Sequence, residues 1–296
     1  MTLRDLSKNT RRSYNGWLER LYHHAGCSLE QIHSDGVADF LHHLVTAEKL
    51  KASTLNQAFC GIRLYFRDYR KRRGNEWDIW DQFKIRKNKT LPHVLTQEEV
   101  QLLLSHIRKG RYRSVLTTMY LCGLRISEAV SLQPQSIIGK RKVVQILNSK
   151  GGKSREVPLC DELYGKLRIH WKNHRNPNWL FPSKSTNWRS FGSMKNALNC
   201  SSTHISPATL RDVFRIAARE SGLADQHRKI TPHTLRHSYA THLIENGACI
   251  RSVSAYLGHA SLEATMIYLH MTQVSEDRAR LVISDLAQKQ FLPPLG

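Results

Sequence analysis

Apolar residues recur at helical spacing along almost the whole chain, and this periodicity most constrains the fold. The first such stripe consists of Tyr14, Trp17, Leu18 and Leu21. Similar stripes continue from Ala208 almost to the C-terminus. Two short β-rich runs, 143–147 and 155–159, flank a turn that contains two glycines, which is typical of a hairpin. The sequence therefore predicts a mainly α (α+β) protein with a small antiparallel β-sheet.

A basic connector interrupts the helical pattern between residues 84 and 92, where the sequence reads KIRKNKTLP. The length of 296 residues suits two domains better than one. We therefore predict an N-terminal helical domain over residues 1–88 and a larger, mostly helical domain with the hairpin over residues 89–296.

Within these domains, the third predicted helix has an apolar face formed by Leu55, Phe59, Ile62, Phe66 and Tyr69. Thr96 and Glu99 match the capping-box pattern at the start of a later helix. Residues 183–206 are rich in Ser and Asn and lack periodicity, so we expect a long loop there.

The charge of the chain narrows its choice of partner. The 45 Lys and Arg residues outnumber the 24 Asp and Glu residues, which gives a net charge of +21. Self-repulsion of this size penalises a compact protein unless a polyanion binds it, so nucleic acid is the first candidate and an anionic membrane the second. A solvated cationic surface is the alternative. The candidate DNA-binding residues are Arg63, Arg67, Arg70, Lys71, Arg72, Lys84, Arg86, Lys87 and Lys153.

The compartment follows from what the sequence lacks. The six cysteines form no CxxC pair, which argues against a disulfide framework and a cysteine zinc site. No run of 18 apolar residues and no signal peptide are present. We expect a cytoplasmic protein with reduced thiols and no membrane partner.

Four segments carry residues suited to phosphate chemistry. In order along the chain they read GLRISE (123–128), SKGGKSREVPL (149–159), HTLRHSYATHL (233–243) and LGHASLEATMIYLH (257–270). His233 and His237 have the spacing of two metal ligands on a helix, but no third ligand is evident, so no metal is expected. His233 and Arg236 share a helix face near a helix N-terminus that begins with Pro232, which favours a phosphate.

Together these motifs resemble the tyrosine recombinases, the phage-integrase and Xer-like family of site-specific DNA recombinases. The last segment resembles the family pattern LGHxxxxxTxxYxH. The segment from Leu6 to Tyr14 resembles the start of the family's core-binding, SAM-like domain, so the resemblance covers nearly the whole chain. It implies a core-binding domain followed by a catalytic domain.

The resemblance also implies residue roles. Tyr268 would be the nucleophile that forms a 3′-phosphotyrosyl link and releases a 5′-hydroxyl. Arg125 and Arg236 would clamp the phosphate and stabilise the transition state, and Glu128 would orient site residues. These cations make a cofactor unnecessary.

The resemblance also implies which residues transfer protons. Lys150 would be the general acid for the leaving 5′-oxygen, although Lys153 in the same turn competes for that role. His233 would transfer a proton or bind the phosphate, and His259 would donate a hydrogen bond to it. His237 is expected to pack or hydrogen-bond locally.

The resemblance further implies an assembly on double-stranded DNA. We expect a monomer in solution, a dimer on a paired site and a homotetramer in the synaptic complex, which exchanges strands through a Holliday junction. Such a protein would be prokaryotic and belong to a mobile element or a similar system. The apolar stripe of Ala279, Val282, Ile283 and Leu286 would dock on a neighbouring subunit or on the chain's own core.

Three other functions remain open at this point. A type IB topoisomerase shares the chemistry, but the Xer-like N-terminal portion disfavours it. A non-catalytic DNA-binding protein would not need the tyrosine and its basic partners. A metal-dependent nuclease would need clustered carboxylates, and the acidic residues are scattered.

Overall fold

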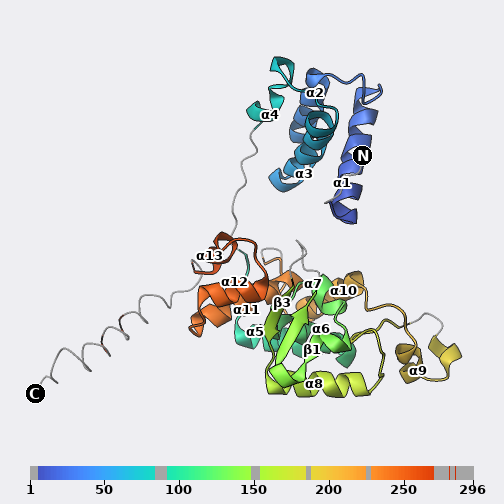
Figure 1. Cartoon of the computed structure of the whole chain (residues 1–296), viewed down its shortest axis with the longest axis vertical. Helices are drawn as coiled ribbons and strands as arrows, with labels where there is room; N and C mark the ends of the chain where they lie inside the picture. Colours follow the sequence, from blue (N-terminus) through green and yellow to red (C-terminus); the bar gives the residue numbers. More distant parts are fainter. Residues whose placement is uncertain are drawn as a thin grey trace, which may run out of the picture. The chain divides into compact units, whose positions relative to one another are not determined.

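The protein is described by a computed structural model that covers residues 6–83, 92–147, 154–184, 188–224 and 228–269, with residues 280 and 284. It is mostly helical with one small antiparallel sheet, which confirms the predicted fold class (Figure 1). The chain divides into two compact units, Met1–Thr90 and Leu91–Gly296. The predicted domain boundary lies in the connector, outside the described residues, and stays a prediction.

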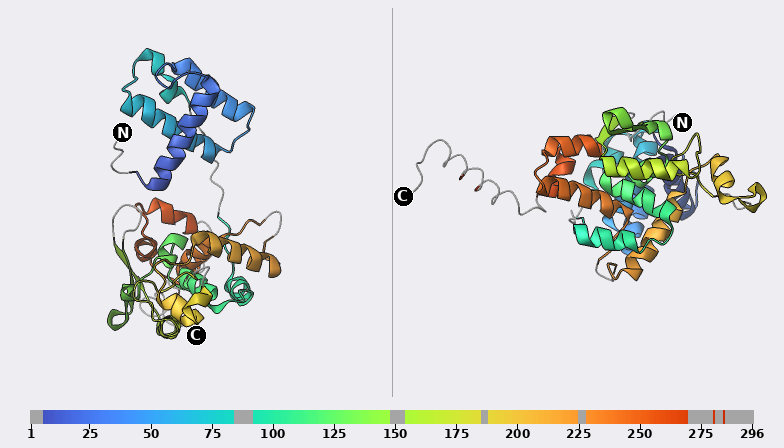
Figure 2. Two further views of the ribbon diagram at one scale, coloured as in Figure 1. Left: turned by 90° about the vertical axis from the view of Figure 1, so that its right-hand side faces the viewer. Right: turned by 90° about the horizontal axis from the view of Figure 1, so that it is seen from below.

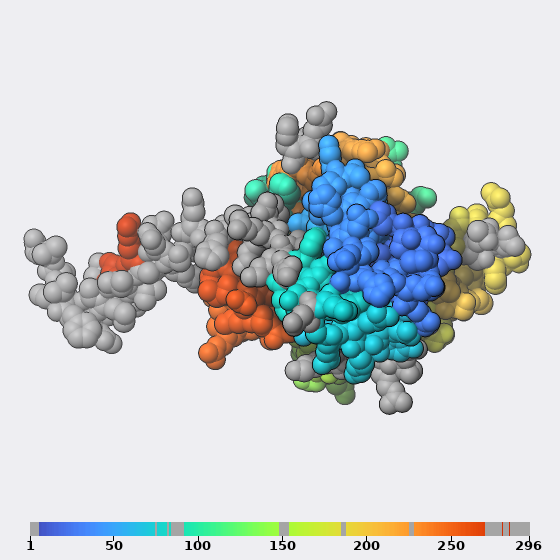
Figure 3. Space-filling view, turned by 90° about the horizontal axis from the view of Figure 1, so that it is seen from above, coloured from blue at the N-terminus to red at the C-terminus, as the bar shows by residue number. Residues whose placement is uncertain are grey.

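The N-terminal unit is a helical bundle whose outer surface runs from blue to cyan in Figure 3. Its helical elements are α1 (Lys8–Ala25), α2 (Ser34–Thr46), α3 (Ala52–Arg63), the π-helical turn η1 (Leu64–Tyr69), the 3-10 turn η2 (Asn75–Trp77) and α4 (Ile79–Gln82). Helices α1 and α3 lie side by side (Figure 2). A Cβ at Gly61 would lie only 3.0 Å from the ring of Tyr14, so glycine permits this close approach.

The apolar face of the third helix was predicted only in part. Phe59, Ile62 and Phe66 are buried as expected, but Tyr69 is 48% exposed. The α-helix changes into the π-helical turn η1 after Arg63, and the wider turn shifts every later side chain around the axis. The prediction for Tyr69 was therefore wrong because it assumed an unbroken 3.6-residue period.

The C-terminal unit surrounds a larger apolar core. Its α-helices are α5 (Gln97–Ser105), α6 (Gly110–Leu121), α7 (Ile126–Val130), α8 (Asp161–Lys172), α9 (Met194–Asn199), α10 (Pro207–Glu220), α11 (Pro232–Glu245), α12 (Ile250–Leu257) and α13 (Glu263–Leu269). Helices α6 and α8 lie side by side (Figure 2). The predicted capping box is confirmed, since Thr96 N donates to Glu99 Oε2 at 2.9 Å and Glu99 N to Thr96 Oγ1 at 3.2 Å.

The sheet confirms the predicted hairpin. Its strands are β1 (Ile137–Ile138), β2 (Val143–Ile146) and β3 (Arg155–Pro158), antiparallel in the order β1-β2-β3. In this register Val144 faces Val157, and both side chains are buried. Strand alternation then places Arg155 on the same face as Val157, which matters for the site.

The segment 183–206 is not the irregular loop that was expected. It contains the 3-10 turn η5 (Trp188–Phe191) and helix α9, which lies toward the edge of the unit in Figure 1. The buried Asn176 holds the chain at the end of α9. Its Nδ2 donates to the carbonyl oxygens of Leu198, Asn199 and Ser201 at 2.8–2.9 Å. Helix α9 has only six residues, too few for a periodic apolar pattern to reveal it.

Candidate active site

Helix α11 supplies three of the basic side chains that the sequence singled out. Pro232 occupies its first turn, and the backbone N–H of Thr231 donates to Thr234 Oγ1 at 3.0 Å. Leu235 is fully buried and anchors the helix in the core. This anchoring fixes the positions from which Arg236 and its neighbouring histidines project.

Among the described residues, Arg236 is the largest side chain that is less than 2% exposed. Its Nη1 donates to the carbonyl oxygen of Gly123 at 2.8 Å, and its Nη2 donates to that of Leu257. The guanidinium thus joins α11 to the turn before α7 and to the end of α12. Burial, followed by repulsion from Arg125, lowers the pKa of Arg236 to about 10, so this side chain is still charged at neutral pH.

Arg125 and Glu128 come together at the start of α7. Glu128 Oε2 accepts from the backbone N–H of Arg125 at 2.8 Å, and Oε1 accepts from the Arg125 Nη1 at 2.8 Å. Arg236 Nη1 lies 3.8 Å from Glu128 Oε2. The carboxylate therefore contacts both arginines that the family resemblance places on the phosphate.

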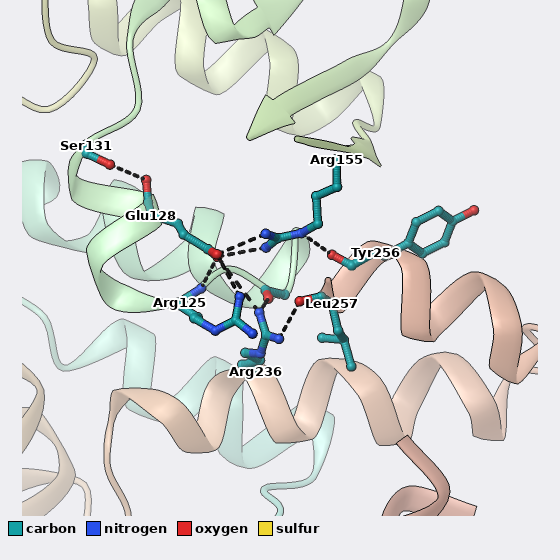
Figure 4. Close-up of polar contacts among 8 residues, drawn as sticks. Arg125, Glu128, Ser131, Arg155, Arg236, Tyr256 and Leu257 are labelled. Carbon is teal, nitrogen blue, oxygen red and sulfur yellow. Dashed lines mark hydrogen bonds and ion pairs between the residues drawn. The ribbon is translucent and has the colours of Figure 1, made fainter. Parts of the chain in front are cut away.

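A third arginine, missed by the sequence reasoning, completes this cluster. Arg155 Nη1 and Nη2 donate to the two oxygens of Glu128 at 2.9 and 2.7 Å, and its Nε donates to the carbonyl oxygen of Tyr256 at 2.7 Å. Figure 4 shows Glu128 between the guanidinium groups of Arg125, Arg155 and Arg236. The alternation of side chains along a strand could have revealed it. Arg155 lies two residues before the apolar Val157 and so shares its buried face, and a buried arginine requires an acidic partner.

The pKa of Glu128 records the balance of these contacts. Burial by itself raises the pKa of this carboxyl, but hydrogen bonds from Arg155 and Arg125 and the charge of Arg155 outweigh it and lower the pKa to about 2. Glu128 is therefore ionised at neutral pH. One carboxylate against three guanidinium groups leaves a net positive charge, which suits a bound phosphate.

The candidate nucleophile lies beside this cluster. Tyr268 is on α13, is 2% exposed, and packs with Tyr239 and Leu257. Its hydroxyl lies 2.8 Å from Nδ1 of His237 on α11. Burial raises the pKa of Tyr268, while the charges of Arg236 and Arg125 lower it in part.

His259 follows directly on the C-terminal end of α12. Gly258 ends that helix with φ of +64°, and a Cβ there would lie 2.9 Å from Arg155 Cδ. His259 Nδ1 lies 2.8 Å from the hydroxyl of Thr265, which is fully buried. Burial, then the charges of Arg236 and Arg125, lower the pKa of His259 to about 4, so the neutral ring predominates at pH 7.

His233 lies at the rim of the same site. Its side chain is exposed, and its ring centroid lies 4.6 Å from that of His237 in an edge-on arrangement. Partial desolvation, then Arg236 and Arg125, lower the pKa of His233. The structure thus brings together five of the six predicted catalytic residues, namely Arg125, His233, Arg236, His259 and Tyr268.

The sixth, Lys150, lies outside the described residues, as does its competitor Lys153. The strands β2 and β3 that flank their turn are described and end next to the site, where Arg155 binds Glu128. Neither lysine's role is tested by this geometry. The apolar stripe predicted over residues 279–286 also falls outside the described side chains, apart from Arg280 and Ser284.

The basic residues of the N-terminal unit have mixed surroundings. Arg70 forms an ion pair with Glu30 at 2.9 Å, and Arg72 donates to the carbonyl oxygen of Glu30 at 2.8 Å. The guanidinium of Arg63 lies over the ring of Phe59, 5.6 Å from its centroid. The remaining candidates of this unit are the half-buried Arg67 and the exposed Lys71, with Lys84, Arg86 and Lys87 outside the described residues.

Two other features are absent from the described part of the chain. No helix there is long and apolar enough to cross a membrane. No group of three or more His, Cys, Asp or Glu side chains is arranged to hold a metal ion in the same residues.

Comparison with known proteins identifies the class. Residues 93–274 match the phage integrase family, and residues 1–76 match the N-terminal SAM-like domain of phage integrases. The chain therefore belongs to the phage integrase family, the tyrosine recombinases. Members of this class are enzymes that cleave and rejoin DNA strands.

Individual relatives are similar in sequence to this chain over most of their length. An integrase/recombinase homologue of Sinorhizobium fredii, y4qK, is 31% identical over 272 residues, covering 92% of this chain and 82% of the relative. Tyrosine recombinase XerA of Pyrococcus furiosus is 30% identical over 277 residues, covering 92% of this chain and 87% of the relative.

Solved structures share the fold. The Tn1549 transposon integrase in complex with transposon right-end DNA aligns with a TM-score of 0.68 at 18% identity, over 96% of this chain and 95% of that one. A lambda integrase dimer bound to a COC′ core site aligns with a TM-score of 0.69 at 17% identity, over 90% of each chain.

Proposed function

We propose that this protein is a site-specific DNA recombinase that cuts and rejoins strands through a 3′-phosphotyrosyl intermediate. The observation that carries the proposal is the position of Tyr268, whose hydroxyl lies in one site with Arg236 and Arg125. Both guanidinium groups are close enough to lower the pKa of the tyrosine. A nucleophile beside two fixed cations is what attack on a phosphodiester requires.

The proposed cleavage step follows from these charges. Tyr268 Oη attacks the scissile phosphorus while Arg125 and Arg236 bind the non-bridging oxygens, where negative charge accumulates. His259, held by Thr265, and the exposed His233 contribute further hydrogen bonds to the phosphate. The bond to the 5′-oxygen breaks, and that oxygen takes a proton from Lys150.

Rejoining is the reverse reaction with a different 5′-hydroxyl. The phosphotyrosyl bond conserves the energy of the broken phosphodiester, so ligation needs neither ATP nor a metal in this scheme. Glu128 does not react. It fixes Arg125 and Arg236 through the contacts of 2.8 and 3.8 Å described above.

The proposed partner is double-stranded DNA. The net charge of +21 supports it, and several structural neighbours are recombinases or integrases bound to DNA. We assign backbone contacts to the core-binding domain over residues 1–88, through the basic residues named above, and catalysis to residues 89–296. Because such contacts release counterions, binding should weaken steeply with salt.

The assembly is proposed by analogy with the lambda integrase dimer on its core site. A dimer would occupy a paired site, and two dimers would form a tetramer that exchanges strands through a Holliday junction. Residence on a mobile element in a prokaryotic cytoplasm is part of the same proposal.

Two of the alternatives named above, the topoisomerase and the non-catalytic DNA-binding protein, are less well supported. A type IB topoisomerase does not account for the match of residues 1–76 to the SAM-like domain of phage integrases. A non-catalytic DNA-binding protein does not account for a buried tyrosine hydrogen-bonded beside a cluster of arginines.

A covalent-capture experiment tests the proposal. Wild-type protein is incubated in EDTA with a randomised pool of duplexes, and DNA that stays attached after denaturation is amplified and sequenced. The selected duplex, nicked near the cleavage point so that the cut strand dissociates, should give a covalent adduct with the wild-type protein and none with Tyr268→Phe. Specific binding without any adduct would contradict the proposal and favour the non-catalytic reading.

The same nicked duplex separates the two candidate acids. Lys150→Ala should lose adduct formation by about 100-fold, the usual scale for removal of a general acid, while Lys153→Ala should retain it. The opposite order would assign the acid to Lys153.

A further inference from the structure

His237 is a titratable side chain that the proposed cleavage step does not use, yet it touches the reacting atom. Its Nδ1 lies 2.8 Å from Tyr268 Oη, and the two ring centroids are 5.7 Å apart. Among the described residues, it is the one side chain that hydrogen-bonds this hydroxyl. The tyrosine must lose a proton when it attacks phosphorus, so the group that receives this proton needs an assignment.

The other histidines of the site are less well placed to receive the proton. His259 Nδ1 is occupied by Thr265 at 2.8 Å. His233 contacts the ring of His237 edge-on, with 4.6 Å between the centroids, and forms no hydrogen bond with Tyr268 among the described residues. Within the described part of the chain, the hydrogen bond of the tyrosine hydroxyl is therefore to His237.

The protonation state of His237 suits an acceptor. Burial, then the positive surroundings of His233, Arg236 and His259, lower the pKa of His237 to about 4. The ring is therefore neutral at pH 7. Burial also raises the pKa of Tyr268, so its hydroxyl keeps its proton. In the imidazole tautomer that carries its proton on Nε2, Nδ1 accepts the hydrogen bond from Tyr268 Oη, and this is the tautomer that a base requires.

Binding of DNA makes this histidine a stronger base. A phosphate held by Arg125 and Arg236 brings negative charge close to His237 and offsets the cations that depress its basicity. The proton also becomes more acidic as the bond between Oη and phosphorus forms. A weak base in contact with the hydroxyl is therefore sufficient for a concerted transfer.

We propose that His237 is the general base of strand cleavage, an inference that rests on the recombinase function proposed above. The O–H bond of Tyr268 breaks and its proton moves to Nδ1 of His237. The bond between Oη and phosphorus forms, the bond from phosphorus to the 5′-oxygen breaks, and that oxygen is protonated by Lys150. In rejoining, the 5′-hydroxyl attacks and His237 returns its proton to the departing tyrosine.

Two substitutions test the base and its geometry separately. His237→Ala removes the acceptor and should slow single-turnover adduct formation about 100-fold. His237→Asn places an amide oxygen near the position of Nδ1, which can orient the hydroxyl but cannot hold its proton, so it should be nearly as slow. Wild-type rates in either variant would overturn the proposal, because they would leave at most an orienting role.

A sulfur-substituted duplex separates base from acid. When the leaving 5′-oxygen is replaced by sulfur, departure no longer requires a proton, because a thiolate is a far weaker base than an alkoxide. This substrate should restore adduct formation to Lys150→Ala and leave His237→Ala slow. Restoration of His237→Ala would overturn the proposal, since it would place His237 on the leaving group.

The pH profile gives a readout that a structural role would not change. Above pH 6 the wild-type rate with the sulfur-substituted duplex should be nearly flat, because His237 is already neutral. The rate of His237→Ala should rise with pH as solvent hydroxide takes over the proton. A flat profile for His237→Ala would contradict the proposal.

Controls keep this inference separate from the function on which it rests. Circular dichroism melting and binding to the selected duplex should be close to wild type for His237→Asn. A wild-type protein that forms no adduct contradicts the recombinase function itself. Adduct formation by wild type together with full activity of both His237 variants contradicts only the role of His237.

Discussion

Arg155 and Glu128 form a two-pronged ion pair of 2.7 and 2.9 Å in which both side chains are less than 10% exposed. The pair joins β3 to α7, where Arg125 begins the helix. Arg155 also binds the end of α12 through the carbonyl oxygen of Tyr256, directly before the segment that carries His259. One buried carboxylate thus holds together three parts of the site that are far apart in the sequence.

Removing the charge of this carboxylate should damage both stability and activity. Glu128→Gln leaves Arg155 and Arg236 buried without their counter-charge, so it should destabilise the protein by about 3 kcal/mol and lower adduct formation at least about 10-fold. Urea unfolding and single-turnover assays measure the two effects. The matched control is Glu156→Gln, whose partner Arg141 is exposed, and which should cost less than about 1 kcal/mol. Equal costs for the two variants would contradict a central role of Glu128.

The unfolding free energy should fall in acid in two stages. His170, His237 and His259 have pKa values lowered to about 4 from 6.5, so the folded protein binds fewer protons and loses stability as pH falls from about 6.5 to about 4. Glu128, with its pKa near 2, adds a second loss between about pH 4.5 and 2.

Single substitutions assign these stages. His170→Asn should flatten the upper stage without changing adduct formation, because the ring contacts of His170 are to His174 and Phe181, neither of which belongs to the site. His259→Asn should flatten the same stage and also slow adduct formation. An unchanged pH slope in both variants would show that these rings are not held neutral by the fold.

The turn before Arg125 requires glycine at position 123. Its φ is +58°, and a Cβ would lie 2.4 Å from the ring of Tyr239. Gly123→Ala should therefore lower the melting temperature strongly or prevent folding, since a buried aromatic ring must move. Gly165→Ala in α8 is the control, because no atom lies within 4 Å of its added Cβ. This change should leave stability unchanged or raise it by about 0.5–1 kcal/mol, which thermal melting would show.

Thr265 should matter more for cleavage than for folding. Thr265→Val keeps the shape of the side chain but removes the hydroxyl 2.8 Å from His259 Nδ1, so the imidazole loses its fixed orientation. We expect about 1 kcal/mol of destabilisation and about 10-fold slower adduct formation. Thr118→Val, at another fully buried threonine with a hydrogen bond in α6, should cost similar stability and leave cleavage intact. Equal cleavage in the two variants would contradict a role for Thr265.

Spacing along the sequence predicted the elements of this fold well where they are regular. The stripe with Trp17 and Leu21, the hairpin of β2 and β3, and the capping box at Thr96 all depend on contacts within a few residues. The exposure of Tyr69 and the existence of helix α9 were missed because the prediction depends on a regular local period. A π-helical turn breaks the period, and a six-residue helix is too short to show one.

In the site, the sequence predicted which residues lie in motifs but not the contacts between different elements. The motifs named Arg125, Arg236, His259 and Tyr268 because each lies in a recognisable local pattern. Arg155 and His237 lie in the same motifs, but their partners are 27 and 31 residues away, on other elements. Spacing within one motif does not encode such contacts, which only the packing of α11 against α13 and of β3 against α7 creates.

The most direct test of the recombinase mechanism is to identify the residue that becomes attached to DNA. Protein captured on the selected nicked duplex is digested with nuclease and protease, and the modified peptide is sequenced by mass spectrometry. The mechanism predicts a nucleotide joined through its 3′-phosphate to Tyr268, with a free 5′-hydroxyl on the released strand. A linkage to any other residue, or a phosphate left on the 5′ end, would contradict it.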